Sequence, residues 1–323
     1  MDKVLFLTHD FTDPQFNLAS EEYLLKHRKE NFIYLWRNKP AVIVGVNQNA
    51  LQEINLDYTE KNGVKIVRRL TGGGAVYHDL NNLCYTVITE SGGGEYDYGK
   101  FAKPVVEYLN SLGVKAEFSG RNDITVDGKK ISGTAHTVFG NRVMHHGTLL
   151  FNTDMAALTG ALKPNRLKTE SKGIKSVRAR VANIIEYLPD TTISEFTRGL
   201  SEYLKKSCEE YRFTTEDISA INKLVQEKYS TYEWNIGRSP SGKNLFEKKF
   251  PFGIFSFSFD TVDGKVQNAR IFGDFFSAKD INGFADSLNG VRFTQKDLLA
   301  AFSIIGEYIS GANAEEIIAA LFA

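Results

Sequence analysis

Cysteine is nearly absent from this chain, with two residues in 323, Cys84 and Cys208. So few cysteines exclude the disulfide framework of small secreted proteins, and a reducing, cytoplasmic setting is expected. No apolar run reaches the ~18 residues that a membrane-spanning helix needs. The N-terminal apolar stretch, residues 4–7, is too short for a signal peptide.

An excess of charge of one sign is also lacking, because 39 basic and 39 acidic residues give a formal net charge of zero. This balance gives no support for a general binder of nucleic acid or of a membrane surface. What remains, 42% hydrophobic and 24% charged residues, is an ordinary globular composition. A chain of 323 residues is long enough for a substantial core, and we expect two domains.

The most informative stretch is residues 68–79, where Arg68 and Arg69 precede three consecutive glycines and His78 and Asp79 close the segment. Glycines carry no Cβ, so the backbone N–H groups of such a loop can approach a ligand closely. Successive N–H groups form an anion-binding concavity, and arginine is a suitable partner for phosphate or carboxylate. The alternative is an ordinary glycine turn between two strands, with solvated arginines.

This loop fits neither of two common phosphate-binding patterns. No segment matches the P-loop pattern G-x-x-x-x-G-K-[ST], and Tyr77 stands where the dinucleotide fingerprint needs its third glycine. Residues 64–67 before the loop and 83–89 after it are rich in β-branched or aromatic residues. A strand–loop–strand arrangement is therefore expected.

Hydrophobic periodicity predicts a mixed α+β protein. The expected helices cover residues 13–26, 99–111, 192–211 and 215–229, and the expected strands cover 32–37, 41–46, 64–67, 83–89, 124–126, 130–131 and 142–151. Asp127-Gly128 predicts a two-residue hairpin turn. A second glycine cluster, residues 91–94, lacks flanking cations and is expected to be a flexible connection.

Residues 233–248 are the best candidate for a linker, because Gly, Ser, Pro, Asn and Lys accumulate there. We therefore expect a large domain over residues 1–240 and an accessory domain over residues 247–323. In the latter, Asp263-Gly264 predicts a hairpin between strands at 252–259 and 265–272, followed by two or three helices. A hairpin with helices suits a small α+β domain.

Three further positions carry side chains suited to one reaction. Lys130, just after a tight turn, would be held by the sheet and could bridge phosphate and carboxylate oxygens. Asn122 and Asp123 could orient a ligand or hold Mg²⁺. Together with an anion-binding loop, they fit the activation of a carboxylic acid by ATP, in which attack on the α-phosphorus builds negative charge that fixed cations stabilise. Taken singly, each is more simply explained as a turn residue or a solvated lysine.

His145 and His146 are adjacent on an expected strand. Successive strand residues point to opposite faces, so at most one of them can enter a given pocket. The same alternation places Lys129 on the face opposite to Lys130.

Several segments, in order, resemble the motifs of the lipoate–protein ligase A family, within the biotin/lipoate protein ligase superfamily. They are residues 68–79, 120–123, 130–133, 145–149, 172–181 and 233–237. The motifs are long, and the resemblance covers nearly the whole chain.

This resemblance implies a two-step reaction. Free lipoate and ATP would give lipoyl-AMP and pyrophosphate with Mg²⁺, without a tightly bound organic cofactor. The lipoyl group would then pass to one lysine of an acceptor, either a lipoyl domain of a 2-oxo acid dehydrogenase E2 component or the H protein of the glycine cleavage system. The family fold implies a large mixed-sheet catalytic domain, like that of biotin–protein ligases, with a small C-terminal domain packed against it.

The resemblance also implies site residues. Lys130 matches the catalytic lysine that contacts both the lipoate carboxyl and the α-phosphate. The residues expected at ATP are Arg69, Gly74, Ala75, Val76, Tyr77, Lys130 and Asp123, with Asp123 also the expected Mg²⁺ ligand. The residues expected at lipoate are Gly72, Gly73, His78, Asn122, Lys130, Gly133, His146 and Thr148.

Two positions depart from the family pattern. Asn81-Asn82 stands where Gly-Asn is usual, and asparagine tolerates a positive φ better than most residues if one is needed there. Thr71 replaces the common serine and keeps its hydroxyl.

Other activities leave different signatures. Octanoyl transferases of the same fold use an exposed, activated cysteine, whereas Cys84 lies in an apolar strand and Cys208 on an expected helix. Biotin ligation would need a Gly-Arg-Gly-Arg-type loop, which the sequence lacks. A zinc enzyme would need H-E-x-x-H or cysteine pairs, and the sequence has neither of these patterns. A non-catalytic lipoate binder would not need Arg69, Lys130 and Asp123 together.

Overall fold

The computed structural model describes residues 4–91, 98–120, 122–163, 181–206, 208–237 and 243–322. Several predicted features lie outside these residues: the glycines at 92–94, residue 121, the motif at 172–180 and the expected linker at 238–242.

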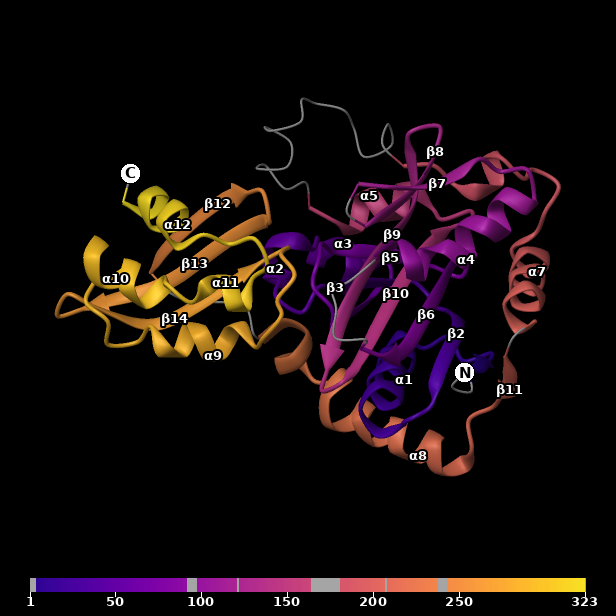
Figure 1. The fold of residues 1–323 in the computed structure, drawn as a ribbon, viewed down its shortest axis with the longest axis horizontal. Helices are drawn as coiled ribbons and strands as arrows, with labels where there is room; N and C mark the ends of the chain where they lie inside the picture. The colour runs from indigo at the N-terminus through magenta and orange to yellow at the C-terminus, as the bar shows by residue number, and fades with distance from the viewer. Residues whose placement is uncertain are drawn as a thin grey trace.

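A mixed sheet of eight strands forms the centre of the larger unit (Figure 1). Its strand order is β11-β1-β2-β6-β10-β9-β8-β7, and β1 runs parallel to both β2 and β11 while the other pairs are antiparallel. The strands are β1 Val4–Thr8, β2 Asn31–Arg37, β6 Asn82–Glu90, β7 Ala116–Ser119, β8 Asp123–Val126, β9 Lys129–Phe139, β10 Arg142–Leu150 and β11 Glu209–Tyr211. A smaller sheet, β4-β3-β5, contains β3 Ala41–Val44, β4 Lys65–Arg68 and β5 Val76–His78. The two sheets confirm the predicted α+β class.

Helices cover both faces of the large sheet. Along β6, Tyr85 joins the hydrophobic cluster beneath α4 (Tyr98–Ser111) and α7 (Ile193–Lys205). The neighbouring Cys84 joins the cluster on the other face, beneath α1 (Pro14–His27), α8 (Thr215–Leu224) and part of the small sheet. The remaining helical segments of this unit are α2 Ala50–Glu53, α3 Leu56–Lys61, α5 Met155–Ala161, η2 Ile184–Glu186 and the π-helical turns η3 Val225–Tyr229 and η4 Glu233–Gly237.

Helix α1 begins where the sequence predicts. The side chain of Asp13 accepts hydrogen bonds from the backbone N–H groups of Gln15, at 2.8 Å, and Phe16, and Pro14 occupies the first turn, where its missing N–H is harmless. The helix is buried deeply enough that Glu21 and Glu22 are only 1% and 4% exposed. Two buried carboxylates on one helix require partners, and those of Glu21 lie in the candidate site.

Two expectations are wrong for the chain segment at 192–211. This segment is not one helix, because α7 ends at Lys205 and Glu209–Tyr211 forms β11. The cause is tertiary, since the backbone of β11 pairs in parallel with β1 at the sheet edge. Cys208 therefore lies between α7 and β11 and not on a helix.

The C-terminal unit contains a sheet of three strands, β12 Asn244–Phe250, β13 Gly253–Val262 and β14 Lys265–Gly273. Four short helices follow, more than the expected two or three: α9 Ile281–Ser287, α10 Gln295–Phe302, α11 Ile305–Tyr308 and α12 Ala314–Leu321. Both predicted hairpin turns form, with φ of +50° at Asp127 and at Asp263. The expected linker at 233–248 is structured at both ends, because η4 occupies its start and β12 its end.

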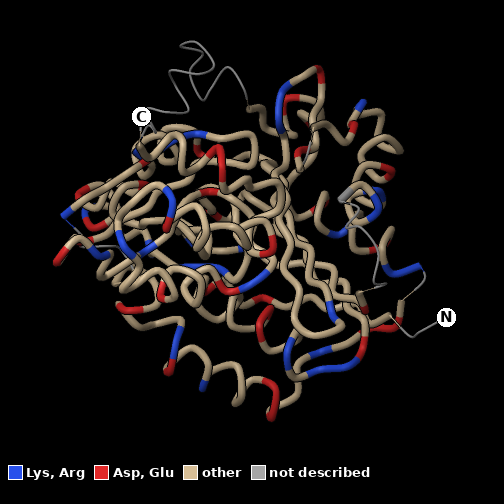
Figure 2. The backbone as a smooth tube through the Cα atoms, turned by 60° about the vertical axis from the view of Figure 1, so that its left-hand side comes forward, with Lys and Arg blue, Asp and Glu red and all other residues tan. Residues whose placement is uncertain are grey.

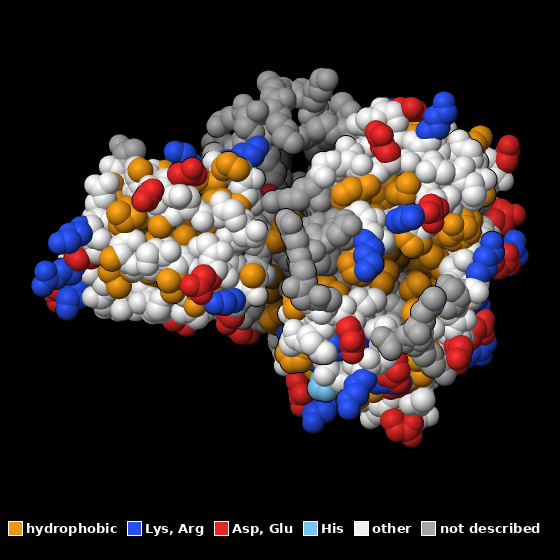
Figure 3. Space-filling view, in the orientation of Figure 1, with side chains coloured by type: hydrophobic (Ala, Val, Ile, Leu, Met, Phe, Trp, Pro, Cys, Tyr) orange, Lys and Arg blue, Asp and Glu red, His pale blue; other side chains and the backbone are white. Residues whose placement is uncertain are grey.

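The C-terminal unit projects to the left of the larger unit in Figures 1 and 3, and its hydrophobic cluster contains only residues from Phe246 onward. Positive and negative residues are interspersed along the chain in Figure 2, in line with the balanced composition. No helix within the described residues has both the length and the hydropathy needed to cross a bilayer.

Candidate active site

Predicted site residues gather on one face of the large sheet. His146 and Thr148 of β10 are two residues apart and point the same way, and the register places Thr148 opposite Cys84 of β6. The N–H of Gly133 in β9 donates to Oγ1 of Thr148 at 3.5 Å, and Gly133 lies opposite Asp123 of β8. Four neighbouring strands thus bring together residues that are far apart in the sequence.

His145 and His146 enter different environments, as predicted. His145 stacks on Phe101 of α4, with ring centroids 5.3 Å apart and planes inclined by 17°, and burial lowers its pKa. His146 lies on the opposite face, where its Nδ1 is 2.9 Å from a carboxylate oxygen of Glu21. Of the two, His146 alone shares a face with Thr148.

Lys130 forms an ion pair with Asp123, with Nζ and Oδ1 2.7 Å apart. Both side chains are about one third exposed, at 37% and 36%. The backbone of Lys130 is also fixed, because its carbonyl accepts from the N–H of Ala182 at 2.9 Å. Lys129 points elsewhere, toward Glu186, which confirms that the two lysines diverge.

The two arginines before the glycines point into the protein. Arg68 is fully buried, and its Nη1 donates to the carbonyls of Gly45 and Gln48 while its Nε donates to that of Trp234 in η4. Arg69 is 6% exposed. In this structure both guanidinium groups bond to backbone and side-chain oxygens of the protein, so they hold the loop in shape.

The donors of Arg69 close the glycine loop on itself. Its Nη2 donates to the carbonyls of Gly72, at 2.6 Å, and Gly74, at 2.9 Å, and its Nε donates to Oγ1 of Thr71 at 2.8 Å. Gly73 between them has φ of +89°, a conformation that side chains with a Cβ rarely adopt. The loop thus needs both its arginine and this glycine.

His78 and Cys84 lie side by side, buried, with Nδ1 and Sγ 3.6 Å apart. Burial, assisted by the charge of Arg69, lowers the pKa of His78 to about 3, so its ring is neutral. Burial also holds the pKa of the Cys84 thiol well above its usual range. A neutral imidazole next to a protonated, inaccessible thiol is not an activated nucleophile.

The other predicted residues have mainly backbone or packing roles in this structure. Asn122 exchanges hydrogen bonds with the backbone of Thr134, which anchors the start of β8. Tyr77 is 5% exposed and packs in the cluster around the small sheet. Asn81, where the family usually has glycine, is not among the residues with positive φ in the described chain, so this departure brings no backbone strain.

Two parts of the site were not anticipated from the sequence. One is Glu21, a carboxylate in mid-helix; the available signal was two adjacent acidic residues within a helix expected to pack on the core. The other is the segment after β14, which the structure places against the glycine loop.

The C-terminal unit touches the loop directly. A Cβ added at Gly72 would lie 2.5 Å from the carbonyl oxygen of Phe275, and one added at Gly73 would lie 3.6 Å from the ring of Phe276. Nearby, Nδ2 of Asn47 donates to Oγ of Ser277 at 3.0 Å. Position 72 therefore has no room for a side chain, because the backbone of the C-terminal unit passes next to it.

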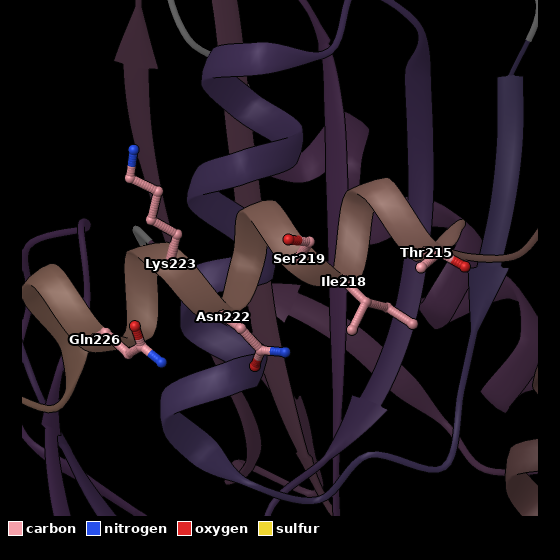
Figure 4. A pocket seen from close by; sticks show the side chains of 6 residues that line it. All are labelled: Thr215, Ile218, Ser219, Asn222, Lys223 and Gln226. Carbon is pink, nitrogen blue, oxygen red and sulfur yellow. The ribbon is translucent and has the colours of Figure 1, made fainter.

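A separate surface hollow lies along α8 (Figure 4). It is lined by Thr215, Ile218, Ser219, Asn222, Lys223 and Gln226. None of these residues belongs to the strands that carry Lys130 or His146, so we give this hollow no part in the site. Within the described ranges, no three His, Cys, Asp or Glu side chains come together as a metal site of their own.

Comparison with known proteins identifies the family. Residues 13–205 match the lipoyl protein ligase A/B catalytic domain, and residues 239–321 match the bacterial lipoate protein ligase C-terminus. Lipoate-protein ligase LplJ of Bacillus subtilis (strain 168) is 40% identical over 320 residues, which cover 96% of this chain and 95% of the relative.

Solved structures agree with this match. P. falciparum LipL1, in complex with lipoate, is similar with a TM-score of 0.80 and 26% identity, covering 98% of this chain and 99% of that chain. A lipoate-protein ligase A bound with ATP is similar with a TM-score of 0.64 and 31% identity, covering 73% of this chain and 99% of that chain. This chain is therefore a ligase and belongs to the lipoate–protein ligase family.

Proposed function

We propose that this ligase activates free lipoate with ATP to form lipoyl-AMP and then transfers the lipoyl group to a lysine of an acceptor protein. The observation that carries the proposal is the Lys130–Asp123 pair at 2.7 Å, held on the same sheet face as Thr148 and His146. A mobile cation beside a carboxylate can change partners when an anionic ligand arrives. The lipoate-bound and ATP-bound relatives support the choice of substrates.

In the first step the lipoate carboxylate would attack the α-phosphorus, and pyrophosphate would leave. Lys130 would then bridge the carboxylate and the α-phosphate, which neutralises the charge that builds between them. The N–H groups of Gly74 to Tyr77, the expected nucleotide loop, would bind phosphate oxygens, and the N–H of Gly73, expected at lipoate, would join them. Arg69 would act through the loop that it shapes, and Gly72, Gly133, His78, His146 and Thr148 would line the lipoyl chain.

Asp123 would be the Mg²⁺ ligand contributed by the protein. Its side chain is 36% exposed, and Mg²⁺ usually takes one or two carboxylates, with substrate phosphates and water completing its shell. A single protein carboxylate, that of Asp123, is therefore sufficient for a Mg²⁺ ion that is otherwise bound by phosphates and water. When bound, the ion would neutralise phosphate charge, while Lys130, freed from Asp123, would be available to the reacting oxygens.

We further propose that residues 1–240 form the catalytic domain and residues 247–323 an accessory domain, whose first strand, β12, begins slightly earlier, at Asn244. The acceptors would be lipoyl domains of 2-oxo acid dehydrogenase complexes and the glycine cleavage H protein, in the cytoplasm. Acyl adenylates hydrolyse readily, so a site that makes one must exclude water. The contact of Phe275 and Phe276 with the glycine loop supports a closing role for the accessory domain.

Mass spectrometry of a lipoyl domain after incubation with the enzyme, lipoate, ATP and Mg²⁺ tests this function. The expected result is a mass gain of one lipoyl group that disappears when ATP is omitted or the acceptor lysine is replaced. Parallel reactions with octanoate and with octanoyl-carrier protein distinguish the ligase from an acyl transferase. Transfer from the carrier protein without ATP would overturn the proposal.

A further inference from the structure

A continuous chain of buried side chains connects helix α1 to the glycine loop. On the side of α1, Nε1 of Trp36 donates to Oγ1 of Thr86 (3.0 Å), which donates to Oε1 of Glu21 (2.5 Å). The same oxygen of Glu21 is 2.9 Å from Nδ1 of His146. On the side of the loop, Nε2 of His146 is 2.8 Å from Oγ1 of Thr71, which accepts from Nε of Arg69 (2.8 Å). Every residue in it is at most 8% exposed. These side chains are therefore hydrogen-bonded mainly to one another and not to bulk water.

The two ends of the chain fix the direction of every proton within it. The indole of Trp36 and the guanidinium of Arg69 can only donate, and the carboxylate of Glu21 can only accept. With a neutral imidazole, His146 carries its proton on Nδ1, which faces Glu21, and accepts the hydroxyl proton of Thr71 at Nε2. The neutral side chains are left with one arrangement that satisfies all of these bonds.

This arrangement reaches the loop backbone through Arg69. The carbonyls of Gly72 and Gly74 point at its Nη2. A peptide unit is planar and trans, so its N–H points opposite to its C=O. The N–H groups of Gly73 and Ala75 must then point away from Arg69, which is the orientation an anion-binding loop requires.

Charge balance supports the same connection. Glu21 is a buried anion and Arg69 a buried cation, and His146 and Thr71 lie between them. Burial lowers the pKa of Arg69 to about 10, while the charge of Glu21 opposes that shift. A buried charge that loses its partner is strongly destabilising, so removal of Glu21 would disturb Arg69 at the far end of the chain.

We propose that Glu21 is a positioning residue of the nucleotide site: through His146, Thr71 and Arg69 it aims the N–H groups of Gly73 and Ala75 at the phosphates of ATP. This inference rests on the proposed function for the identity of the anion. Glu21 itself does not touch the nucleotide. Its effect is transmitted over three side chains by hydrogen-bond direction.

Binding of ATP to the full chain, measured by titration calorimetry without lipoate, tests the proposal. Glu21→Gln removes the charge, and Thr71→Val removes the connecting hydroxyl while keeping the side-chain shape. Each is expected to weaken ATP binding about tenfold, the effect of breaking one or two buried hydrogen bonds. Thr71→Ser keeps the hydroxyl and should restore binding to within about twofold, a difference of ~0.4 kcal/mol or less.

Glu22→Gln is the matched control. Glu22 is the next residue of the same helix and is also buried, but its partners are Lys228, Lys26 and Tyr229, away from the loop. Its replacement should lower the melting temperature without changing ATP affinity. Equal weakening of ATP binding by Glu22→Gln and Glu21→Gln would mean that α1 acts only as bulk structure, and would overturn the proposal.

The double variant gives a second, independent decision. If Glu21 acts through Thr71, the pair of substitutions should weaken ATP binding no more than the worse single one. Fully additive effects, or wild-type ATP affinity in Thr71→Val, would overturn the inference even if Glu21→Gln fails to fold. Failure of the wild-type chain to bind ATP would instead contradict the proposed function.

Discussion

Gly133 lies directly beneath the ammonium group of Lys130: a Cβ built on Gly133 would be 2.8 Å from Nζ and 3.0 Å from Cε. Gly133 has no positive φ, so alanine is compatible with its backbone. The lysine end is flexible and would yield before the strand does. The glycine is thus required by the position of Lys130 and not by the backbone.

Gly133→Ala should therefore displace Lys130 without unfolding the protein. We expect lipoate-dependent pyrophosphate release to fall about 10- to 100-fold, because a displacement of about 1 Å at a catalytic group has effects of this size. The melting temperature should be unchanged. Gly283→Ala, on a helix with open space around it, is the control, and a wild-type rate in Gly133→Ala would contradict the steric argument.

Lys130→Ala should be more severe, since it removes the cation altogether. Loss of one fixed donor to a developing charge typically reduces the rate about 10²- to 10³-fold. Pyrophosphate release is again the measurement. Lys129→Ala is the adjacent control, because Lys129 faces Glu186, and comparable rates in Lys130→Ala and wild type would remove Lys130 from the mechanism.

Neither cysteine should be required. Cys84 is buried with a raised pKa, and the Sγ of Cys208 bonds to the carbonyl of Leu204 outside the candidate site. Cys84→Ser and Cys208→Ser, together, should leave lipoyl transfer intact, apart from a small loss of stability at the buried position. Loss of transfer in a folded variant would favour a covalent acyl-enzyme instead.

The accessory domain should affect the two half-reactions unequally. Gly72→Ala would place a Cβ against the backbone of Phe275, which cannot move aside like a side chain, and should separate the domain from the loop. We expect adenylate formation from lipoate and ATP to fall more than transfer from supplied lipoyl-AMP. Truncation after Gly242 should give the same ratio; equal losses in both assays, or none, would contradict a closing role.

Stability should fall between pH 6.5 and 5. His78 and His9 have pKa values lowered by burial to about 3 and about 4. A base that binds its proton more weakly when folded favours the unfolded chain as the pH drops below its unfolded value of 6.5, and the loss continues down to the folded pKa. For His78 this amounts to about 2 kcal/mol by pH 5.

Urea unfolding at pH 7 and pH 5 measures this loss. His78→Gln should reduce the difference between the two pH values, whereas His27→Gln, at an exposed position, should not. An unchanged difference in His78→Gln would show that His78 is not buried as a neutral ring.

Local patterns in the sequence were sufficient for much of this fold. The Asp13-Pro14 start of α1, both Asp-Gly hairpins and the divergence of Lys129 from Lys130 each depend on neighbouring residues, and the structure confirms them. The helix expected over 192–211 is shorter than predicted because its last residues form β11, which pairs with the distant strand β1. Edge pairing of this kind leaves no mark on local periodicity.

The site shows the same division between local and distant causes. Gly73 has the positive φ that a glycine-rich loop suggests. Gly72, in contrast, is required by its contact with the backbone of Phe275, about 200 residues later in the chain. The orientation of the two arginines is set by the backbone carbonyls to which they donate. The sequence alone does not distinguish an arginine that hydrogen-bonds the loop backbone from an arginine that binds a ligand.

The separate hydrophobic clusters of the two units have a thermodynamic consequence. The C-terminal cluster, with the residues packed against it, begins at Phe246, and the clusters of the larger unit contain no residue beyond Ile236. Units with separate hydrophobic cores can melt as separate cooperative blocks. Heating should therefore produce two calorimetric transitions, and a saturating nucleotide should move one of them more than the other.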